Sequence, residues 1–423
     1  MSIQCIRGVK DILPPEIEIW QTIEHKAKSL LEQFGFKEIR LPLLERTELF
    51  HRSIGEETDI VSKEMYTFED RGGEKITLRP EATASVVRAY LQHNLYTLDP
   101  IQKLYTIGPM FRRERPQKGR YRQFYQINAE VFGIDSPLID AQIIFMLMYF
   151  FKNLSLTNVQ LHINSLGCRE CRPQFYHALN TYLSQFNADD LCEHCNRRRT
   201  TNPLRVLDCK VEKCRQAMKD VPSILEFLCP DCVSHFQLVQ TTLANQGIDF
   251  TINNQLVRGL DYYTRTTFEI QTSHLGAQNA IAGGGRYDGL IQLLGGPDIP
   301  AIGFAIGVDR LIELYMQHHE SPKPYVDMFI IALDAPSKKM AYTLCCDLCI
   351  KGIQVEMDYS ARSLKSLMKR ADKLNAHFVM IMGEQELANN SVILRNMNTK
   401  EQFVLSTNGI VDHLLTQFFI TPH

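Results

Sequence analysis

The first periodic pattern in the chain lies between residues 15 and 34, where apolar side chains recur at three- and four-residue steps. That spacing places them on one face of an amphipathic helix. The apolar positions are Trp20, Ile23, Ala27, Leu30, Leu31 and Phe34. Gly35 follows directly and suits the end of a helix, because glycine readily adopts the left-handed conformation found there. The sequence therefore predicts a helix over 15–34.

An extended segment is expected next, at FKEIRLPLLE (36–45). Pro42 lies inside it, and proline cannot donate a backbone hydrogen bond to a neighbouring strand, so we expect a sheet edge or an interface here. Short strand-like pieces at 64–78 surround a DRGG turn. The segment RPEATASVVRAYLQ then predicts a helix with Pro80 near its first turn.

Alternating patterns predict further strands in the middle of the chain. Two strands are expected over about 101–133, on either side of a basic loop, followed by a helical run and a strand at VQLHINSLG. Sheet-like patterns return at FTINNQLVRGLDYYTRTTFEIQT and at AIGFAIGV. These segments belong to a mixed structure of helices and strands.

The last hundred residues change to a strand–helix–strand alternation. Strands are expected at DMFIIAL, IQVEMDY and HFVMIMG, with one helix between the first two strands and a second helix, SLKSLMKRADKL, between the last two. This order favours a separate α/β domain over 325–423. The proline-containing stretch SPKPY (321–325) is the expected linker.

Composition bounds the kind of protein. A chain of 423 residues with 44% hydrophobic and 22% charged residues is typical of a globular protein with two or three domains. The net charge of −2 gives no overall positive field, so a nucleic-acid site must be a local basic patch. The N-terminus lacks the apolar core of a secretory signal, and the longest apolar run (141–151) is too short to cross a bilayer. We therefore expect a cytoplasmic protein.

Eight of the twelve cysteines fall between residues 168 and 235, where little strand pattern is seen. They form three C-x-x-C pairs and one wider pair: Cys168/Cys171, Cys192/Cys195, Cys229/Cys232 and Cys209/Cys214. In a reducing compartment such cysteines are thiols or metal ligands. The spacing suits two structural zinc sites of four cysteines each, but free thiols in a small helical domain remain the alternative. Cys345, Cys346 and Cys349 fall in a helical pattern and are expected in a core.

The basic loop, RRERPQKGRYR (112–122), holds six positive side chains and one negative side chain. Its proline and glycine exclude a helix. From charge alone it is either a solvated hairpin or a ligand-binding loop. The next strand, QFYQINAEV, gives a further indication because successive side chains point to opposite faces.

One face of that strand carries Tyr125, Ile127, Ala129 and Val131 and is a core face. The other carries Phe124, Gln126, Asn128 and Glu130. A polar face beside a cluster of arginines packs poorly and suits the floor of a site for a charged small ligand. Glu130 is then either the structural partner of an arginine or a receptor for a cationic or hydrogen-donating ligand.

Several stretches together resemble the class II aminoacyl-tRNA synthetases in their histidyl form. The sequence FRRERPQKGRYRQFYQINAEVFG resembles motif 2, FGFKEIRLPLLERTELF resembles motif 1, and AIGFAIGVDRLIEL resembles motif 3. LVRGLDYYTRTTFEI and AGGGRYDGL are similar to segments specific to the histidyl branch, and TLRPEATA to its substrate-amine segment. The resemblance covers nearly the whole chain.

The resemblance implies an α+β fold with an antiparallel catalytic sheet. The catalytic domain is expected in two parts, 1–167 and 241–320, interrupted by a cysteine-rich, mostly helical insertion at 168–240. The domain at 325–423 is expected to bind the anticodon. Motif 1 implies a homodimer.

The implied reaction activates L-histidine with ATP to give histidyl-adenylate and pyrophosphate, and then transfers histidine to the 3′ end of tRNA(His). The residues implied to bind ATP are Arg112, Glu114, Arg120, Phe124 and Arg310. Arg112 and Arg258 are the implied catalytic residues and face the α-phosphate from two sides. Arg120 and Arg310 hold the distal phosphates, with Mg²⁺ between them, and Phe124 and Arg310 cover the two faces of the adenine.

The implied histidine-binding residues are Glu81, Thr83, Arg112, Gln126, Glu130, Arg258, Tyr262 and Tyr263. Glu81 and Thr83 are expected at the α-amino group, Gln126 at the backbone end, and Glu130 and Tyr263 at the imidazole. Tyr262 and Tyr287 would line the pocket. Outside the motif, both members of the Tyr262–Tyr263 pair are as consistent with ordinary strand aromatics.

Two further points follow from the resemblance. Arg258 and Tyr263 fall on opposite faces of a regular strand and converge only if the backbone turns, which Gly259 permits. The glycines at 283–285 are either a flexible turn or a close backbone approach under the histidine pocket. Arg115, Gln117 and Lys118 of the basic loop would contact the tRNA acceptor stem.

Two non-catalytic alternatives are weaker. A regulatory relative of the synthetases keeps the fold but tends to lose the arginine segment at 256–270 and the C-terminal domain, and both are present here. A tRNA-binding stress regulator would need an added effector domain, for which a chain of 423 residues has no room.

Overall fold

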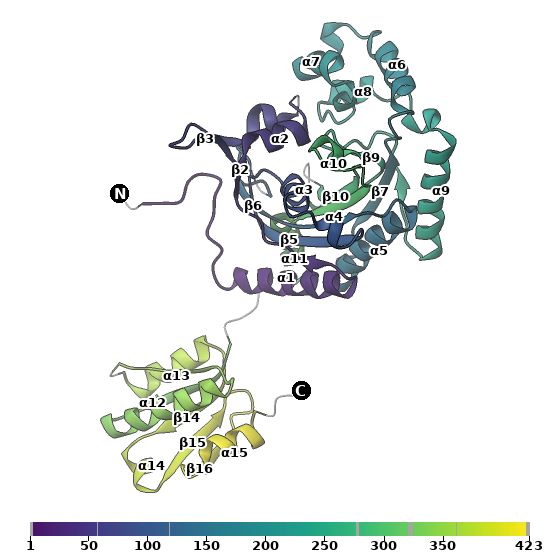
Figure 1. Ribbon diagram of the computed structural model, residues 1–423. Helices are drawn as coiled ribbons and strands as arrows, with labels where there is room; N and C mark the ends of the chain where they lie inside the picture. Colours follow the sequence, from purple (N-terminus) through teal and green to yellow (C-terminus); the bar gives the residue numbers. More distant parts are fainter. Residues whose placement is uncertain are drawn as a thin grey trace. The chain divides into compact units, whose positions relative to one another are not determined.

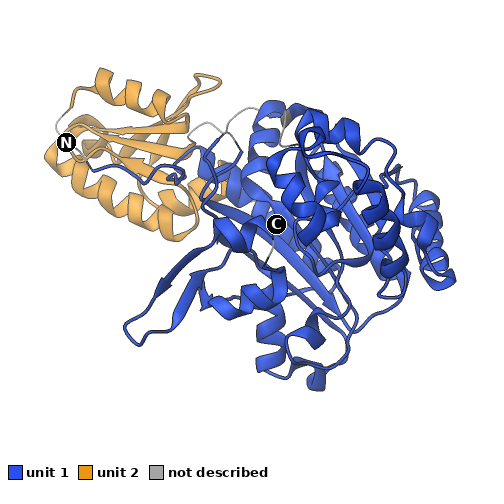
Figure 2. Cartoon of the chain, turned by 90° about the horizontal axis from the view of Figure 1, so that it is seen from above, with its two compact units in different colours: residues 1–320 blue, residues 321–423 orange. Residues whose placement is uncertain are grey.

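The computed structural model of the chain describes residues 3–56, 58–117, 119–275, 279–319, 325–360 and 362–419. They form two compact units, residues 1–320 and 321–423, coloured separately in Figure 2. Figure 1 shows the helices and strands of each unit in sequence colours.

The first unit is built on an eight-stranded sheet with the order β1-β5-β6-β11-β10-β9-β7-β8. Its strands are β1 (Lys37–Glu38), β5 (Gln102–Phe111), β6 (Gln123–Phe132), β7 (Gln160–Ser165), β8 (Thr251–Ile252), β9 (Thr264–Gln271), β10 (Ala280–Arg286) and β11 (Ala301–Gly307). The six central strands pair antiparallel, and β1 and β8 are added in parallel at the edges. The expected α+β class with a largely antiparallel sheet is confirmed.

One face of the sheet carries the main hydrophobic core. It is covered by α1 (Glu16–Gln33), α5 (Pro137–Asn153), α9 (Pro230–Asn245) and α11 (Val308–His318). Trp20 and Ile23 of α1 are buried, as the periodicity predicted, and the Trp20 ring contacts Tyr125 edge-on at 5.2 Å between centroids. Each large side chain buried in this way stabilises the unit by about 1.5–3 kcal/mol. This core packs against the apolar face of β6.

The opposite face is partly covered by short elements. These are α2 (Thr47–Ile54), a π-helical turn (Ile60–Glu64), α3 (Thr83–Gln92), α4 (Leu95–Leu98) and α10 (Leu290–Leu293). A 3-10 turn (Ser273–Leu275) instead contacts α11. A small antiparallel sheet has the order β2-β4-β3, with β2 (Leu44–Arg46), β3 (Tyr66–Glu69) and β4 (Lys75–Leu78). Pro42 lies between β1 and β2 and belongs to neither strand.

The start of α3 differs from the prediction. The helix begins at Thr83, so Pro80 precedes it instead of lying in its first turn. The carboxylate of Glu81 accepts hydrogen bonds from the backbone N–H groups of Thr83 (2.7 Å) and Ala84 (2.8 Å). Capping by this carboxylate satisfies the free N–H groups of the first turn and sets the helix boundary.

The cysteine-rich segment is inserted between β7 and β9 and is mostly helical, as expected. It contains α6 (Arg172–Leu183), α7 (Glu193–Thr201) and α8 (Glu212–Ala217), with 3-10 turns at Ala188–Asp190, Pro203–Val206 and Ile224–Phe227. Figure 1 shows α6, α7 and α8 gathered at one end of the unit. The segment has its own small core around Phe175, Leu179, Val206 and Met218. The boundaries 168 and 240 stay a prediction.

The second unit has a five-stranded sheet with the order β13-β12-β14-β15-β16. Its elements are β12 (Val326–Ala332), α12 (Ala335–Ile350), β13 (Val355–Met357), α13 (Leu364–Lys373), β14 (Ala376–Met382), α14 (Glu384–Ala388), β15 (Ser391–Asn396), β16 (Gln402–Ser406) and α15 (Ile410–Gln417). The parallel strands β12–β14 were predicted, whereas the antiparallel pair β15–β16 was not. Residues 321–324 of the predicted linker lie outside the described residues.

One expectation for the second unit is wrong. Cys345 is buried in the core beneath α12, but Cys346 and Cys349 are exposed. Cys346 follows Cys345 directly and so points in a different direction. Cys349 is on the same face as Cys345 but lies next to the end of α12 at Ile350, where it is exposed. Within the described ranges, no helix combines the length and hydropathy that a bilayer span requires.

Candidate active site

A cavity of about 1000 Å³ lies in the first unit, on the sheet face opposite the main core. Its wall includes β6, β10, β11, the segment 253–263 and the basic loop, together with residues from the insertion. A volume of this size is at the upper end of the range for small-molecule sites. The cavity can therefore hold more than one small substrate.

Strand register explains why the floor of this cavity is open. The polar face of β6 neighbours residues with little or no side chain on β11, since Asn128 pairs with Ala305 and Glu130 with Gly303. Ala305 in turn pairs with Gly283 on β10. These small residues leave space above the sheet that longer side chains from other segments enter.

Arg258 is one of the side chains that enter this space. It lies in an irregular segment, because β9 begins only at Thr264, and its guanidinium lies over Gly283. It forms an ion pair with Glu269 of β9. Burial is the largest single influence and lowers the pKa of Arg258, but the carboxylate of Glu269 together with Tyr263 and Asp208 raises that pKa overall. Arg258 is therefore a fixed positive charge.

The backbone turns between Arg258 and Tyr263, as expected, and both side chains reach one cavity. The backbone does leave the strand between them, but Gly259 is not among the glycines with positive φ. The bends and turns over 259–262 bring both side chains to the wall without a left-handed residue at this position.

Arg112 follows β5 and lies beside the aromatic ring of Phe124. Its guanidinium carbon is 5.2 Å from the ring centroid, and its Nε donates to the carbonyl oxygen of Pro80 at 2.9 Å. Glu114 lies between two arginines, with Oε1 3.9 Å from Nη1 of Arg112 and an ion pair to Arg120. Burial is the main cause that lowers the pKa of Arg112 and of Arg120.

Arg310 reaches the same cavity from the first turn of α11. Its Nη1 donates to the carbonyl oxygen of Ala280 at 2.8 Å and its Nε donates to Gly119 at 3.1 Å, so it joins β10 to the basic loop. The pKa of Arg310 is lowered by burial and by the nearby charges of Arg120 and Arg112. Three mutually repelling guanidinium groups in one cavity favour an anionic ligand.

Glu130 is held by two hydroxyl groups on one side of the cavity. Thr83 donates to its Oε1 at 2.7 Å and Tyr287 donates to its Oε2 at 2.6 Å. Only 1% of the residue is exposed, and burial raises the pKa of Glu130 to about 8 despite these two hydrogen bonds. Glu130 is not paired with an arginine in the described structure, which removes the structural alternative considered for it.

The tyrosines form a cluster at the same end of the cavity. Tyr262 contacts Tyr263 at 4.8 Å and Tyr287 at 5.6 Å between ring centroids, and all three are buried. Burial raises the pKa of each hydroxyl, so all three are neutral hydrogen-bonding groups at neutral pH. A pocket with aromatic walls and hydroxyl groups suits a flat polar ring.

Several buried polar atoms at the cavity have no hydrogen-bond partner within the part of the chain that the structure describes. They are Oε1 of Gln126, Oδ1 of Asn128, Nε of Arg258 and the hydroxyl of Tyr262. Buried polar groups are nearly always paired, so a cluster of unpaired ones marks a place where a ligand completes the set. Asn128 and Glu269 had no assigned role in our prediction, although the alternation with Gln126 and Glu130 identified the face of Asn128.

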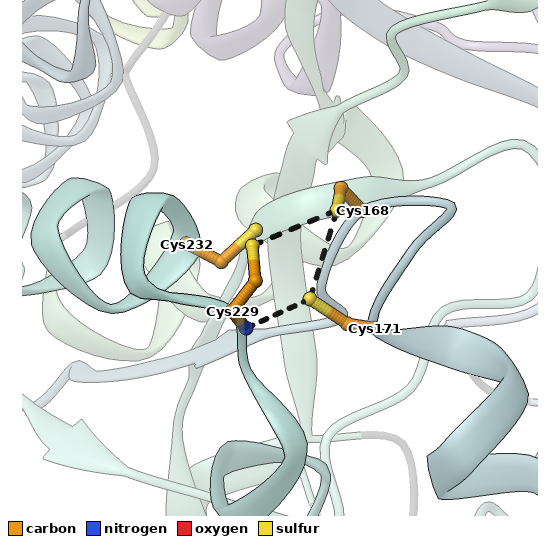
Figure 3. Close-up of side chains that lie close together, drawn as sticks. All are labelled: Cys168, Cys171, Cys229 and Cys232. Carbon is orange, nitrogen blue, oxygen red and sulfur yellow. Dashed lines mark hydrogen bonds between the residues drawn. The ribbon is translucent and has the colours of Figure 1, made fainter.

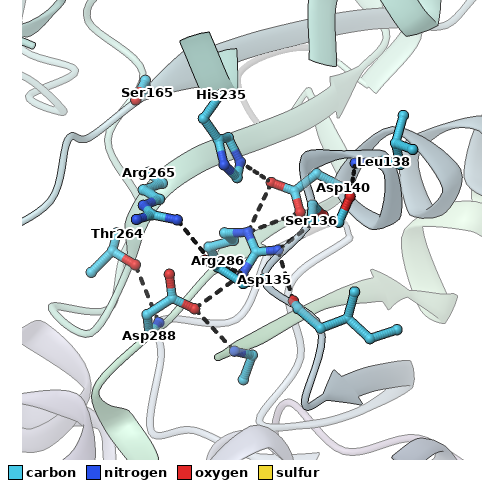
Figure 4. Close-up of polar contacts among 12 residues, drawn as sticks. Asp135, Ser136, Leu138, Asp140, Ser165, His235, Thr264, Arg265, Arg286 and Asp288 are labelled. Carbon is cyan, nitrogen blue, oxygen red and sulfur yellow. Dashed lines mark hydrogen bonds and ion pairs between the residues drawn. The ribbon is translucent and has the colours of Figure 1, made fainter. Parts of the chain in front are cut away.

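A buried ionic network supports the end of β10 next to Tyr287. Arg286 is fully buried and its Nε donates to Asp140 of α5 at 2.9 Å, while its Nη1 donates to Asp288 at 3.2 Å. His235 of α9 contacts the same carboxylate of Asp140 at 2.8 Å. Figure 4 shows these side chains around Arg286. The network holds the end of β10 directly before Tyr287. The glycines at 283–285 are part of this strand and not a flexible turn.

The eight cysteines of the insertion gather into two groups that could hold a metal ion. The neck group comprises Cys168, Cys171, Cys229 and Cys232, and the core group comprises Cys192, Cys195, Cys209 and Cys214. In each group the four sulfur atoms lie within 4.8 Å of one another. Figure 3 shows the neck group, which joins the beginning of the insertion to the start of α9.

The structure brings nearly all predicted site residues to one cavity. Its wall includes Glu81, Thr83, Arg112, Glu114, Arg120, Phe124, Gln126, Arg258, Tyr262, Tyr263 and Arg310. Glu130 and Tyr287 are not part of the wall, so the prediction that Tyr287 lines the pocket is wrong: its hydroxyl donates to Glu130, which lies behind Thr83. Arg115 and Gln117 are exposed in the basic loop, and Lys118 lies outside the described residues.

Comparison with protein families agrees with this geometry. A family model described as histidyl-tRNA synthetase matches residues 8–311, and one described as an anticodon binding domain matches residues 327–417. Together these ranges cover both units and most of the chain.

Individual relatives match over nearly their whole length. The histidine–tRNA ligase of Desulforapulum autotrophicum is 61% identical over 98% of this chain and 97% of its own, and that of Desulfosudis oleivorans is 57% identical over 98% of each. The crystal structure of apo S. aureus histidyl-tRNA synthetase superimposes with a TM-score of 0.82 at 35% identity, covering 97% of this chain and 99% of that one. With three arginines around one cavity and these matches along both units, the chain belongs to the histidyl-tRNA synthetase family.

Proposed function

We propose that the protein is a histidine–tRNA ligase, which activates L-histidine with ATP and transfers it to the 3′ end of its tRNA. The observation that carries the proposal is that Arg112, Arg258 and Arg310, from three distant stretches, line one cavity. A wall of unpaired polar atoms lies beside them. The names of the full-length relatives support the same reaction.

The activation step requires no protein nucleophile. A carboxylate oxygen of histidine forms a bond to the α-phosphorus of ATP, and the bond from that phosphorus to pyrophosphate breaks. Catalysis then consists of positioning the reactants and neutralising charge on the phosphate. Arg112 and Arg258 have this role in our proposal, because a guanidinium holds phosphate oxygens in pairs and keeps its charge.

ATP is placed by residues on the other side of the cavity. Phe124 supplies a flat surface for the adenine, and Glu114 orients Arg112 and Arg120 through contacts to both. Arg120 and Arg310 are proposed to bind the distal phosphates. Mg²⁺, the ion expected with ATP in this family, would neutralise part of the charge on those phosphates when bound.

Histidine is placed among the tyrosines and the polar face of β6. Glu81 and Thr83 are proposed to bind the α-amino group, and Gln126 the carboxylate end. Tyr263 is proposed at the imidazole, with Tyr262 lining the pocket. A site whose buried polar groups need both ring nitrogens rejects amino acids that lack them, because the groups would be left unpaired.

The part of Glu130 in this proposal is to read the imidazole from behind the pocket wall. Its Oε1 receives a hydrogen bond from Thr83, which is part of the wall, so a change in the ionisation of Glu130 reaches the wall through that hydroxyl group. Glu130 also becomes directly available if Thr83 turns toward a bound amino group.

Transfer to tRNA uses surfaces outside the cavity. The exposed Arg115 and Gln117 of the basic loop, together with Lys118, are proposed to contact the acceptor stem. The second unit, which matches the anticodon binding domain, is proposed to bind the anticodon of tRNA(His). Binding that depends on phosphate contacts weakens as salt increases.

A homodimer through motif 1 is part of the same proposal. β1 is an edge strand of the sheet, and Leu43, Leu44 and Phe68 nearby expose more than two fifths of their surface. Apolar groups of this kind at a sheet edge are typical of an interface. Light scattering that gives the mass of one chain for the fully active enzyme would contradict it. A cytoplasmic location stays a prediction of the sequence.

Zinc is the metal that we assign to the two cysteine groups, and its role is structural. Each group supplies four thiolates, a complete tetrahedral set that leaves no open position for a substrate. No chemical step of histidine activation requires this metal.

The proposal is tested by ATP–pyrophosphate exchange with the purified full-length protein. We expect exchange that depends on histidine, with none for serine, proline or threonine. Replacing Arg258 by alanine should remove most of the exchange while the protein stays folded. Absence of histidine-dependent exchange in the wild-type protein would refute the proposal and favour the regulatory alternative.

A further inference from the structure

The sulfur atoms in both cysteine groups have the spacing of a tetrahedral metal site. With a zinc–sulfur bond of about 2.3 Å, ligands at tetrahedral angles are separated by about 3.8 Å. Cys168 is 3.6 Å from Cys171 and 3.9 Å from Cys229 in the neck group. Cys192 is 3.8 Å from Cys209 in the core group. Each group therefore surrounds one point at bonding distance for a single ion.

Other interpretations of the cysteines fit less well. A disulfide requires about 2.05 Å between sulfur atoms, whereas those of Cys168 and Cys171 are 3.6 Å apart, and all eight cysteines of the two groups are free thiols. Thiols that merely fill a core would not assemble in fours, and the other four cysteines (Cys5, Cys345, Cys346 and Cys349) belong to no such group in the described ranges. The space inside each group admits one ion and no polynuclear cluster, so zinc is favoured over an iron–sulfur centre.

Backbone N–H groups also point at the sulfurs. The N–H of Cys229 donates to Sγ of Cys171 at 3.1 Å, and the N–H of Cys192 donates to Sγ of Cys214 at 3.1 Å. Hydrogen bonds of this kind stabilise a charged thiolate, which is the form that binds metal.

The core group lies close in sequence to three residues that hold the segment carrying Arg258. Asn202, at the end of the helix begun by Cys192, donates to Asp261 at 2.9 Å. Arg205 donates through Nη1 to the carbonyl oxygen of Arg258 at 2.8 Å. The third contact, from Gln255 to the carbonyl oxygen of Met218, is also 2.8 Å.

Each of these three contacts is connected through the backbone to a cysteine of the core group. Cys209 donates its N–H to Val206, next to Arg205, and Met218 donates its N–H to the carbonyl oxygen of Cys214. Together Asn202, Arg205 and Met218 form hydrogen bonds to residues 255–261 on both sides of Arg258. Without regular secondary structure of its own, that segment takes its position from these contacts.

The neck group fixes the other end of the same segment. Cys171 directly precedes Arg172, whose guanidinium donates to the carbonyl oxygen of Tyr263. Cys168 follows Gly167, whose carbonyl oxygen accepts the N–H of Arg265 at 2.9 Å. The group joins residues 61 positions apart, Cys168 and Cys229, at the entry and exit of the insertion.

From these contacts we infer that both cysteine groups are structural zinc sites, and that the core group, through Arg205, positions Arg258 for histidine activation. Arg205 is a positioning residue in this inference, since it contacts the backbone of Arg258 and no substrate. The kinetic part of the inference rests on the proposed function, whereas the zinc assignment is independent of it.

Metal content of the full-length wild-type protein is the first test. The protein is prepared with zinc in the medium and without chelators, and zinc and iron are measured by elemental analysis. We expect two zinc ions per chain and no iron. A zinc content of one or less per chain, or iron in place of zinc, overturns the two-site assignment.

Paired variants separate the two groups. Cys209→Ser with Cys214→Ser should retain one zinc per chain, which also reports that the neck group and its surroundings are folded. The matched control, Cys346→Ser with Cys349→Ser, removes two exposed cysteines that belong to neither group and should retain two zinc ions and wild-type exchange.

Exchange kinetics test the link to Arg258. The core-group variant should lower the kcat of histidine-dependent exchange about 100-fold, the effect of misplacing a catalytic group by about 1 Å. The KM for ATP should change little, because Arg310 donates to Gly119 and Ala280, which lie outside the insertion. Arg205→Met should lower kcat in the same way, and Arg205→Lys, which keeps a donor, should restore part of it.

The outcomes distinguish the two levels of the inference. A core-group variant with one zinc and wild-type kcat overturns the positioning role. An equal loss in Arg205→Met and Arg205→Lys, or a loss seen only in the KM for ATP, also overturns it. Two zinc ions in a wild-type protein without histidine-dependent exchange would uphold the sites and refute the proposed function.

Discussion

The position of Arg258 depends on the absence of a side chain at Gly283, and adding one methyl group tests this directly. A Cβ built on Gly283 would lie 2.6 Å from both terminal nitrogens of the Arg258 guanidinium. Ordinary contact begins at 3.4 Å, so the guanidinium must retreat by about 0.8 Å. Misplacement of a catalytic group by about 1 Å costs on the order of 100-fold in rate. We expect Gly283→Ala to lower kcat for histidine-dependent exchange by that factor.

The assay is ATP–pyrophosphate exchange at saturating ATP, with thermal unfolding as a check on the fold. A double-mutant cycle supplies the control, because two changes that act through one side chain are not additive. Once Arg258→Ala is present, adding Gly283→Ala should cost little more. Near-wild-type exchange in Gly283→Ala, or full additivity with Arg258→Ala, would refute the reasoning.

Three further predictions follow from the same structure. Burial raises the pKa of Glu130 from its ordinary value of 4.5 to about 8 in the folded protein, so its contribution to stability is complete below pH 4.5 and is lost as pH rises toward 8. Glu130→Gln cannot ionise and should flatten the fall in thermal midpoint over this range. Arg310→Ala should raise the KM for ATP roughly 10- to 100-fold, the value of a hydrogen bond to a charged group, with little change in the KM for histidine; equal changes in both would contradict its placement. Phe268 is fully buried beneath β9, so Phe268→Ala should destabilise the first unit by about 3–5 kcal/mol in denaturant unfolding, and a cost below about 1 kcal/mol would show that the site is not packed as described.

The parts of the fold that repeat a simple period were predictable from sequence. The helix expected over 15–34 is α1, and the alternation in QFYQINAEV placed Ile127 and Ala129 in the core. The pair β15–β16 was missed because the turn between its strands holds none of the glycine or proline signals used to find hairpins. The start of α3 was misplaced because Pro80 was treated as the helix signal, when Glu81 forms the cap.

Which residues form the site could be predicted from the sequence, but their arrangement in space could not. The resemblance identified the arginines and tyrosines that line the cavity, but periodicity could not place Arg258, since its segment is irregular and is held by residues of the insertion. The relation of Glu130 to Thr83 and Tyr287 joins three segments far apart in sequence, and pattern within one segment carries no information on it.

The order of strands in the large sheet has a consequence for synthesis of the protein on the ribosome. β6 pairs with β5 at once, but its other neighbour, β11, is made only after residue 300. At about 5–20 residues per second, the intervening chain takes on the order of ten seconds or more to emerge. During that delay one edge of β6 presents a row of unpaired backbone N–H and C=O groups. The helices α1 and α5 are made early and can already cover the apolar face of β6. The nascent chain therefore exposes one unpaired strand edge, but not its hydrophobic core.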